Sequence, residues 1–379
     1  MSDMESKREE LKERAREVAT EVIGPRAADI DVQGDIPADL VEVFAEEGFL
    51  SLMLPDQYGG MNGSITCLCT VVEEIARVCG SSSLLILCHA VGTMPIMVGG
   101  NIGQKRRYYE AISGEAKLMG IALTEPDSGS DAASIRTKAT LEGDFYILNG
   151  RKCFITNGGI ADFYSIFATT DPQQRMGGIT AFVVEEETEG FSIGKKENKM
   201  GMRGSSTTEL ILENAMVPKG NLLGFEGRGW RNAMRTLNMS RPGIGAQAIG
   251  IAQGALDTTL SFARERIRFE RPFTRYQGIQ FMIADMDTQI EAARALVYKT
   301  ASMLDGGVKG VSVEKFSSMS KYFASDVAMK VTTEAVQIME EHGLTRDSPV
   351  ERMMRDAKVT QIYEGTNQVQ RLVVAHAIL

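Results

Sequence analysis

The sequence lacks the features that mark several large classes of protein. Its 379 residues include only three histidines, and its five cysteines form neither a CxxC pair nor a second cluster that could complete a zinc site. HExxH, Walker A and GxSxG motifs are also absent. The sequence therefore gives no support for metal or serine-hydrolase chemistry, and it predicts free, buried thiols of the kind found in a reducing compartment.

Long basic stretches are missing as well. Lys and Arg number 41 against 50 Asp and Glu, a net charge of −9, which disfavours nucleic acids and anionic membranes as partners. The longest segment without a charged side chain, residues 78–104, contains serines, glycines and Pro95 and predicts buried core, with no membrane span. The first 18 residues mix acids with bases and have no apolar signal-peptide core, so we expect a cytoplasmic protein.

Hydrophobic periodicity divides the chain into three parts. Apolar residues recur at helical spacing in 5–24, 37–50 and 81–98. After residue 118, short β-branched or aromatic runs predict strands at 119–124, 145–150, 152–156, 163–169, 179–186 and 207–213. Helical spacing returns at 242–268, 277–305, 312–343 and 348–363. We therefore expect a helical domain over 1–118, a central, antiparallel β domain over 119–228 and a four-helix bundle over 229–379, a mainly α fold without βαβ alternation.

A GxGxxA pattern at residues 243–248 resembles a dinucleotide-binding fingerprint. It follows Ser-Arg-Pro and has no strand before it, which argues against a Rossmann site. Small residues at this spacing within a helix predict close helix packing.

Three other segments carry residues suited to chemistry. LTEPDSGSD (123–131) is a loop of Gly, Ser and Thr that could present N–H groups and hydroxyls to a polar ligand. In KCFITNGG (152–159), Phe154 and Thr156 share one face of a strand, an aromatic and a hydroxyl that suit a flavin ring or an ordinary core. In IYEGT (362–366), Glu364 is either a solvated helix end or a base whose pKa is raised by burial.

Together these segments resemble the acyl-CoA dehydrogenase family, and the match covers nearly the whole chain in the family's order. It rests on the segments PDQYGG, LTEPDSGSD, KCFITNGG, KMGMRGSSTTEL, ERIRFERPFTRYQGIQ and PVERMMRDAKVTQIYEGTNQVQRL. The resemblance implies a fold with an N-terminal helical domain, a middle β domain of barrel or sandwich type and a C-terminal four-helix bundle. It also implies a homotetramer, built as a dimer of dimers.

The resemblance assigns a role to Glu364. In the family, the matching glutamate removes the α-proton of an acyl-CoA thioester while the β-hydrogen leaves as hydride to N5 of FAD, giving a 2-enoyl-CoA. Burial should raise the pKa of Glu364 toward neutrality, where a carboxylate works as a general base. Because Ser240 stands where some relatives keep an alternative glutamate, Glu364 is the sole candidate for the base.

Further residues match the family's binding positions. For the flavin ring and its surroundings these are Leu123, Thr124, Ser130, Phe154 and Thr156. For the pyrophosphate and adenine end of FAD, part of it supplied by a neighbouring subunit, these are Arg266, Phe269, Gln277, Gln337, Thr366 and Gln368. For the CoA and acyl side these are Ser130, Arg241, Tyr363, Gly365, Leu84 and Leu87. Many relatives carry Trp at the position of Phe154, and Phe keeps the stacking surface without the indole N–H.

The chain departs from the family beside the pyrophosphate. Relatives usually have paired glycines after the residue matching Gln337, whereas this chain has Glu340 and Glu341. Glu270 likewise replaces a usual glycine. Carboxylates near a diphosphate are unfavourable unless they turn away or pair with neighbours such as Arg266 or Arg268. We still expect bound FAD, with its adenine end held differently, more weakly or with another partner.

The resemblance also suggests a substrate and an electron acceptor. Leu84 and Leu87 would shorten the acyl pocket, and residues 78–104 offer no cation for a second carboxylate, which predicts a short or compact neutral acyl-CoA. His89 could touch the acyl group, although a core histidine is the simpler interpretation. The expected acceptor is electron-transferring flavoprotein. The alternatives are an oxidase, a dehydrogenase of cyclic or aromatic acyl-CoAs, and a flavin-free protein that binds CoA esters.

Overall fold

The first third of the chain is helical, as its periodicity predicts. The structure, a computed structural model, describes residues 3–379. Its first elements are α1 (Asp3–Glu17), η1 (Val18–Ile23), η2 (Gly24–Arg26), α2 (Ala27–Gln33), α3 (Ala38–Glu46), η3 (Asp56–Tyr58), α4 (Ile65–Ala76), α5 (Gly80–Gly99) and α6 (Ile102–Glu115). The sequence analysis predicted α1, α3 and α5 but missed α2 and α6.

Helix α5 is the buried centre of this part. Every residue from Gly80 to Ile96 is buried, because α5 is packed against α4, strand β1 (Met119–Ala122) and the long helix α7 (Gly229–Glu265). Among the described residues it is the one helix long and apolar enough to cross a bilayer, and 83% of that stretch is buried inside the protein. The expectation of buried core for the uncharged segment is therefore confirmed.

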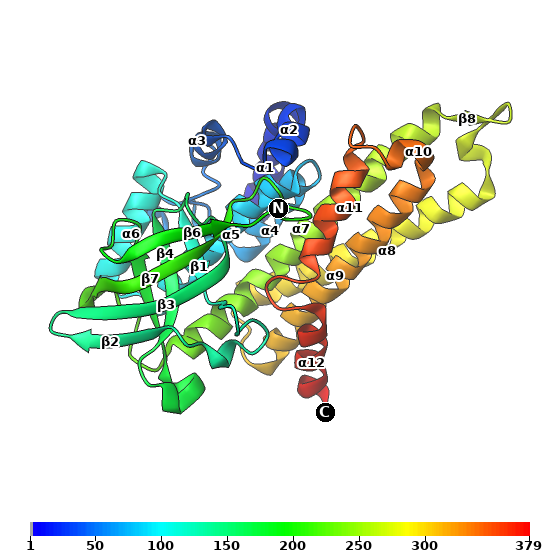
Figure 1. Ribbon diagram of the computed structural model, residues 1–379. Helices are drawn as coiled ribbons and strands as arrows, with labels where there is room; N and C mark the ends of the chain where they lie inside the picture. The colour runs from blue at the N-terminus through cyan, green and yellow to red at the C-terminus, as the bar shows by residue number, and fades with distance from the viewer. Residues whose placement is uncertain (1–2) are drawn as a thin grey trace.

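The middle part is one seven-stranded sheet (Figure 1). After β1 its strands are β2 (Lys138–Glu142), β3 (Phe145–Thr156), β4 (Phe163–Thr169), β5 (Ile179–Glu185), β6 (Phe191–Lys196) and β7 (Thr207–Pro218). Short η4 (Ala132–Ser134) and η5 (Pro172–Gly178) lie between strands, and η6 (Lys219–Asn221) follows β7 and leads to α7. The expectation of an antiparallel sheet was wrong in part, because β4 pairs in parallel with β1 and, at one position, with β2. The two strands expected at 145–150 and 152–156 form one bulged strand, β3.

Long helices form the last part, which Figure 1 shows from yellow-green to red. They are α7, α8 (Gln277–Asp305), α9 (Val311–Ile338), α10 (Glu340–Gly343), α11 (Pro349–Thr360) and α12 (Asn367–Ile378). Between α7 and α8 the chain forms a hairpin of β8 (Ile267–Arg268) and β9 (Arg271–Pro272), followed by η7 (Phe273–Arg275). The expected bundle is present, with α9 ending five residues earlier than the pattern suggested.

Helix α7 begins at Gly229 and continues through Pro242, whereas the sequence pattern placed the start of this helix at residue 242. Proline has no N–H to donate to the carbonyl four residues earlier, which here belongs to Asn238. Ser317 Oγ on α9 donates to that carbonyl oxygen at 2.8 Å, so the hydrogen bond is replaced from a neighbouring helix. Helix α7 therefore spans 37 residues without losing a backbone partner at the proline.

The glycines of the GxGxxA pattern are packing residues, as expected. They lie inside α7 and have no strand before them. A Cβ atom on Gly243 would stand 2.6 Å from Leu87 of α5, and one on Gly245 would stand 2.6 Å from Val297 of α8. The pattern thus allows α5 and α8 to approach α7 closely, and no dinucleotide site is needed to explain it.

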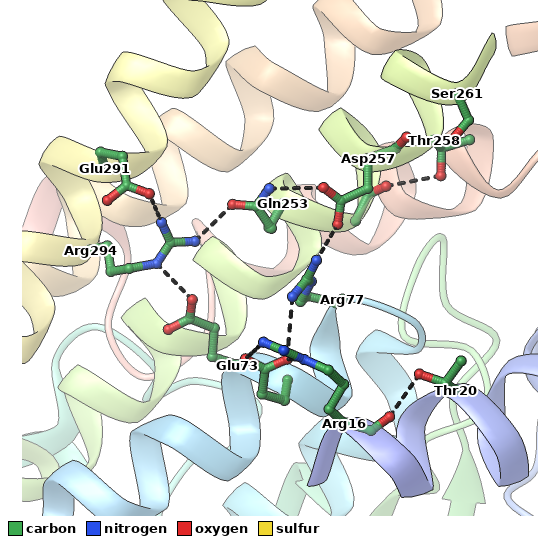
Figure 2. Close-up of polar contacts among 12 residues, drawn as sticks. Arg16, Thr20, Glu73, Arg77, Gln253, Asp257, Thr258, Ser261, Glu291 and Arg294 are labelled. Carbon is green, nitrogen blue, oxygen red and sulfur yellow. Dashed lines mark hydrogen bonds and ion pairs between the residues drawn. The ribbon is translucent and has the colours of Figure 1, made fainter. Parts of the chain in front are cut away.

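A buried carboxylate connects the first and last parts of the chain (Figure 2). Glu73 on α4 accepts hydrogen bonds from Arg294 Nε and Tyr298 Oη on α8, both at 2.8 Å. Arg294 also donates to Gln253 on α7, so one guanidinium joins three helices. The exposed Glu291 pairs with the same arginine from within α8.

We predict that Glu73→Ala lowers the stability of the protein by about 3 kcal/mol, because it removes the buried carboxylate that accepts hydrogen bonds from both Arg294 and Tyr298. The matched change Glu291→Ala removes an exposed partner of the same arginine and should cost less than about 1 kcal/mol. The thermal unfolding midpoints of the two variants test this. Equal midpoints would contradict the structural role of Glu73.

Candidate active site

A tight turn between α11 and α12 presents Glu364. Both Glu364 and Gly365 have left-handed backbones, with φ of 55° and 93°. A Cβ atom on Gly365 would lie 2.2 Å from Gln370 Nε2, so only glycine fits there. The non-glycine residue at positive φ carries strain, which is common where a side chain must be aimed at a functional site.

Three polar side chains surround the Glu364 carboxyl group. Ser240 Oγ on α7 donates to Glu364 Oε2 at 2.9 Å. The cations of Arg241 and Lys321 lie near enough to lower the pKa of Glu364, yet burial outweighs them and its pKa stands above the ordinary value. The group is therefore poised to take up a proton closer to neutral pH than a surface glutamate would.

Lys321 on α9 fixes the Glu364 turn through two hydrogen bonds. Its Nζ is buried and donates to the Gly365 carbonyl oxygen and to Asn367 Oδ1, both at 2.9 Å. Burial lowers the pKa of Lys321 to about 7, while nearby Glu364 opposes that shift. Sequence reasoning missed this residue, although a lysine on the buried face of a helix rich in small residues was a usable signal.

Strand β3 and helix α5 bring further groups to Glu364. Phe154 sits at a bulge of β3 with φ of 57° and is 64% exposed, an unusual state for an aromatic side chain in a strand. Thr156 follows two residues later and hydrogen-bonds the Cys88 thiol of α5. Burial and the nearby charge of Glu364 raise the pKa of Cys88, so it remains a neutral thiol. Sequence reasoning missed Cys88 as a neighbour of Glu364.

The loop after β1 is fixed against β3 by a buried ion pair. Lys152 Nζ donates to Glu125 Oε1 at 2.7 Å and to the Leu123 carbonyl oxygen at 3.2 Å. The Cys153 N–H donates to the Thr124 carbonyl oxygen at 3.0 Å. Leu123 and Thr124 are thereby held beside the strand that carries Phe154 and Thr156, while Ser130 lies exposed further along the loop.

On the other side of Glu364 stand Arg241 and Tyr363. Arg241 is buried and donates from Nη1 to Asn238 Oδ1 at 2.9 Å, but its Nε has no partner among residues 3–379. Tyr363 hydrogen-bonds Gln247 of α7. Arg241 therefore lies close to the carboxyl group of Glu364, and Tyr363 directly precedes it in the chain.

The acyl-pocket candidates of α5 lie in the core. Leu84 and Leu87 are 2% and 0% exposed. His89 hydrogen-bonds the Leu50 carbonyl oxygen through Nε2 and the Met119 N–H through Nδ1, and burial lowers its pKa to about 4. His89 is therefore a neutral core histidine, which confirms the simpler interpretation.

The remaining candidates fall into two groups. Thr366 caps α12 by accepting from the Val369 N–H at 3.3 Å, and Gln368 is exposed in the same helix. The other four, Arg266, Phe269, Gln277 and Gln337, lie toward the far end of α8 and α9, around the hairpin at the upper right of Figure 1. Lys321 of α9 contacts the Glu364 turn, whereas Gln337 lies at the other end of α9, next to the last residue, Ile338. Lys321 and Ile338 are 17 residues apart, which is about 25 Å along the helix axis. One chain therefore does not bring this second group to Glu364.

A groove of about 540 Å³ lies elsewhere, between η1, α4 and α7. Its charged groups are already paired with one another, for example Arg77 with Asp257 and with Glu74 (Figure 2). A groove whose charges are satisfied internally is better explained as a structural network than as a binding site. No cluster of metal-binding side chains occurs in the described part of the chain.

Family models match almost the entire sequence. The N-terminal, middle and C-terminal domains of acyl-CoA dehydrogenase match residues 5–133, 120–215 and 227–379. The chain belongs to the acyl-CoA dehydrogenase family. It is therefore an oxidoreductase that acts on CH–CH bonds, and the resemblance seen in its motifs is confirmed.

Named relatives agree with this assignment. Cyclohex-1-ene-1-carbonyl-CoA dehydrogenase of Geobacter metallireducens is 46% identical over 365 residues, which cover 96% of each chain. The structure of butyryl-CoA dehydrogenase from Megasphaera elsdenii is 39% identical, with a TM-score of 0.96 over 100% of this chain and 98% of that one. A structure described as electron transferring flavoprotein of Acidaminococcus fermentans is 43% identical with the same TM-score and coverage.

We predict that Ser240→Ala shifts the acidic limb of this acyl-CoA dehydrogenase's pH–rate profile upward by about 1 pH unit. The hydroxyl stabilises the ionised form of Glu364, so its loss raises the pKa of the carboxyl group further. Activity that depends on the ionised form of Glu364 should then appear only at higher pH. Ser240→Thr, which keeps a donor, serves as the control, and an unchanged limb in Ser240→Ala would contradict the contact.

Proposed function

We propose that the chain catalyses α,β-dehydrogenation of a short or compact neutral acyl-CoA, with Glu364 as the base that removes the α-proton. The observation that carries this proposal is the carboxyl group of Glu364, which is raised in pKa by burial and aimed by a strained turn. A merely structural carboxyl group would need neither feature. The product is the corresponding 2-enoyl-CoA.

The surroundings of Glu364 suit a proton transfer from a weak carbon acid. Its ionised form is supported by the Ser240 hydroxyl and by two cations, and its desolvation keeps it basic. As negative charge develops on the thioester oxygen, we propose that the Glu364 backbone N–H donates to it. Lys321 fixes the carbonyl of Gly365, so the peptide units of the turn cannot rotate away.

The residues on the β-sheet side fit the ring end of FAD. Exposed Phe154 offers an aromatic face, Thr156 a hydroxyl two residues away, and the loop at Leu123 and Thr124 is held rigidly beside them. Thr208 Oγ1 on the neighbouring strand is buried with no partner in the described structure. When bound there, FAD would supply the acceptor for the β-hydride. Ser130 is the candidate for contacts with the cofactor and the pantetheine arm.

The features of α5 support a compact, neutral acyl group. The α5 side of the proposed acyl pocket has little free space, because Leu84 and Leu87 are buried and Leu87 packs directly against Gly243 of α7. The imidazole of His89 on α5 is neutral and already hydrogen-bonded, so α5 itself offers no cation to a second carboxylate. Relatives named for cyclohexene- and cyclohexane-carbonyl-CoA favour a branched or cyclic group as well as a short one.

For the electron acceptor we propose electron-transferring flavoprotein, which is the family's usual acceptor. One similar structure, 43% identical in sequence, is described as electron transferring flavoprotein of Acidaminococcus fermentans, which supports this choice of acceptor. We further propose that the chain assembles as a homotetramer, since the hairpin residues cannot reach Glu364 of their own chain.

We predict that Glu364→Gln keeps acyl-CoA binding but slows reduction of the cofactor by about 1,000-fold or more, because the amide retains the shape and loses the base. Anaerobic stopped-flow absorbance measures the reduction, and calorimetry measures the binding. Near-normal reduction in this variant would refute the role of Glu364. Conversion of the exposed Glu265 to Gln is the matched control and should change neither quantity.

A panel of acyl-CoAs tests the substrate class. Butyryl-, isobutyryl- and cyclohexanecarbonyl-CoA should be turned over with kcat/KM values at least about tenfold above those of palmitoyl- and glutaryl-CoA, because Leu84 and Leu87 shorten the proposed pocket and α5 offers no cation to a second carboxylate. Comparable rates with butyryl- and palmitoyl-CoA, or a preference for glutaryl-CoA, would contradict the proposed substrate while leaving the reaction class intact.

A further inference from the structure

The hairpin between α7 and α8 is built to expose its tip. β8 and β9 are joined by just two residues, Phe269 and Glu270, with φ of 49° and 57°. Such a turn requires two left-handed residues and strongly favours Asn-Gly. Phe-Glu in this place is strained, and the Phe269 side chain is 92% exposed. Strain and an exposed aromatic ring together indicate a tip that meets another molecule.

The arginines beside this tip are already occupied. Arg266 donates to Glu340 at 3.2 Å and to Glu341 at 2.9 Å, and Arg268 donates to Glu340 at 2.6 Å. The two carboxylates are the first two residues of α10, which follows directly after α9. We call these four side chains the Arg–Glu cluster. Within it, two positive charges are balanced by two negative charges, so the hairpin presents no net attraction to an anion.

Glu340 has a strained backbone conformation. Its φ of 53° lies in the region that favours glycine, so a carboxylate there is retained against backbone preference. Ion pairing with Arg268 and Arg266 lowers the pKa of Glu340 and keeps it ionised. The cluster also leaves Arg266 Nε buried with no partner in the described structure, a donor available to a ligand that displaced the carboxylates.

We propose that Glu340 and Glu341 form a carboxylate plug, which occupies the arginines of the hairpin and weakens their hold on the diphosphate of FAD. The inference rests on the proposed function. Lys321, which contacts the Glu364 turn, and Ile338, which ends α9 beside the Arg–Glu cluster, are about 25 Å apart along the helix axis. The diphosphate in question therefore belongs to a cofactor whose ring lies in a second copy of the chain. FAD must either displace the plug or bind with the arginines unavailable.

Cofactor affinity tests the plug without any turnover. Apoprotein of the wild type, of Glu340→Gln/Glu341→Gln and of Glu265→Gln is titrated with FAD and with FMN, and binding is followed by flavin fluorescence. The double variant should bind FAD about tenfold more tightly than the wild type, and its FMN affinity should not change, because FMN lacks the diphosphate. Glu265→Gln removes one exposed charge from the end of α7 and should match the wild type.

A second variant guards against loss of the local fold. Glu340→Gly suits the left-handed backbone and removes one carboxylate, so it should raise FAD affinity in the same direction. Circular dichroism confirms that each variant is folded. Equal FAD affinity in the wild type and both variants would overturn the plug and leave the proposed function standing. Absence of FAD binding in all of them would overturn both. An equal gain for FMN and FAD would also overturn the plug, because the effect would then not lie at the diphosphate.

Discussion

The central constraint in this structure is the stabilisation of a desolvated carboxyl group on a strained turn. Glu364 can be basic only if it is buried, and burial is tolerable only if its ionised form has partners. Ser240 and Arg241 supply them from α7, and Lys321 fixes the neighbouring carbonyl from α9. These partners reach the Glu364 turn only because α7 and α9 pack beside it. The packing of the bundle and the properties of the site therefore depend on one another.

The same requirement explains features that are otherwise odd. Helix α7 must run unbroken past Glu364, which it does because Ser317 replaces the hydrogen bond lost at Pro242. It must also lie close to α5, which the small residues Gly243 and Gly245 permit. On the sheet side, the bulge of β3 leaves Phe154 exposed, and Thr156 of the same strand hydrogen-bonds Cys88, which lies near Glu364.

Much of this could be predicted from the sequence, and the rest could not for definable reasons. Periodicity predicted the helical, β, helical order, and the motif around Glu364 predicted the family and the residue that we propose as the base. The parallel pairing of β1 with β4 was missed because it is a long-range choice with no local signal. Lys321 and Cys88 were missed because each reaches the site from a helix whose facing direction only packing reveals. The Arg–Glu cluster was foreseen as a possible pairing, but the strained backbone of Glu340 was not.

The central claim is that Glu364 removes an α-proton, and it can be separated from redox chemistry. 3,3-Dimethylbutanoyl-CoA has α-hydrogens but no β-hydrogen, so it can lose a proton and cannot be oxidised. Incubated with the protein in deuterated water, it should exchange one α-hydrogen stereospecifically, as measured by mass spectrometry and NMR. Exchange should be abolished when Glu364 is replaced by Gln. Absence of exchange with a bound analogue, or equal exchange in both proteins, would contradict the account.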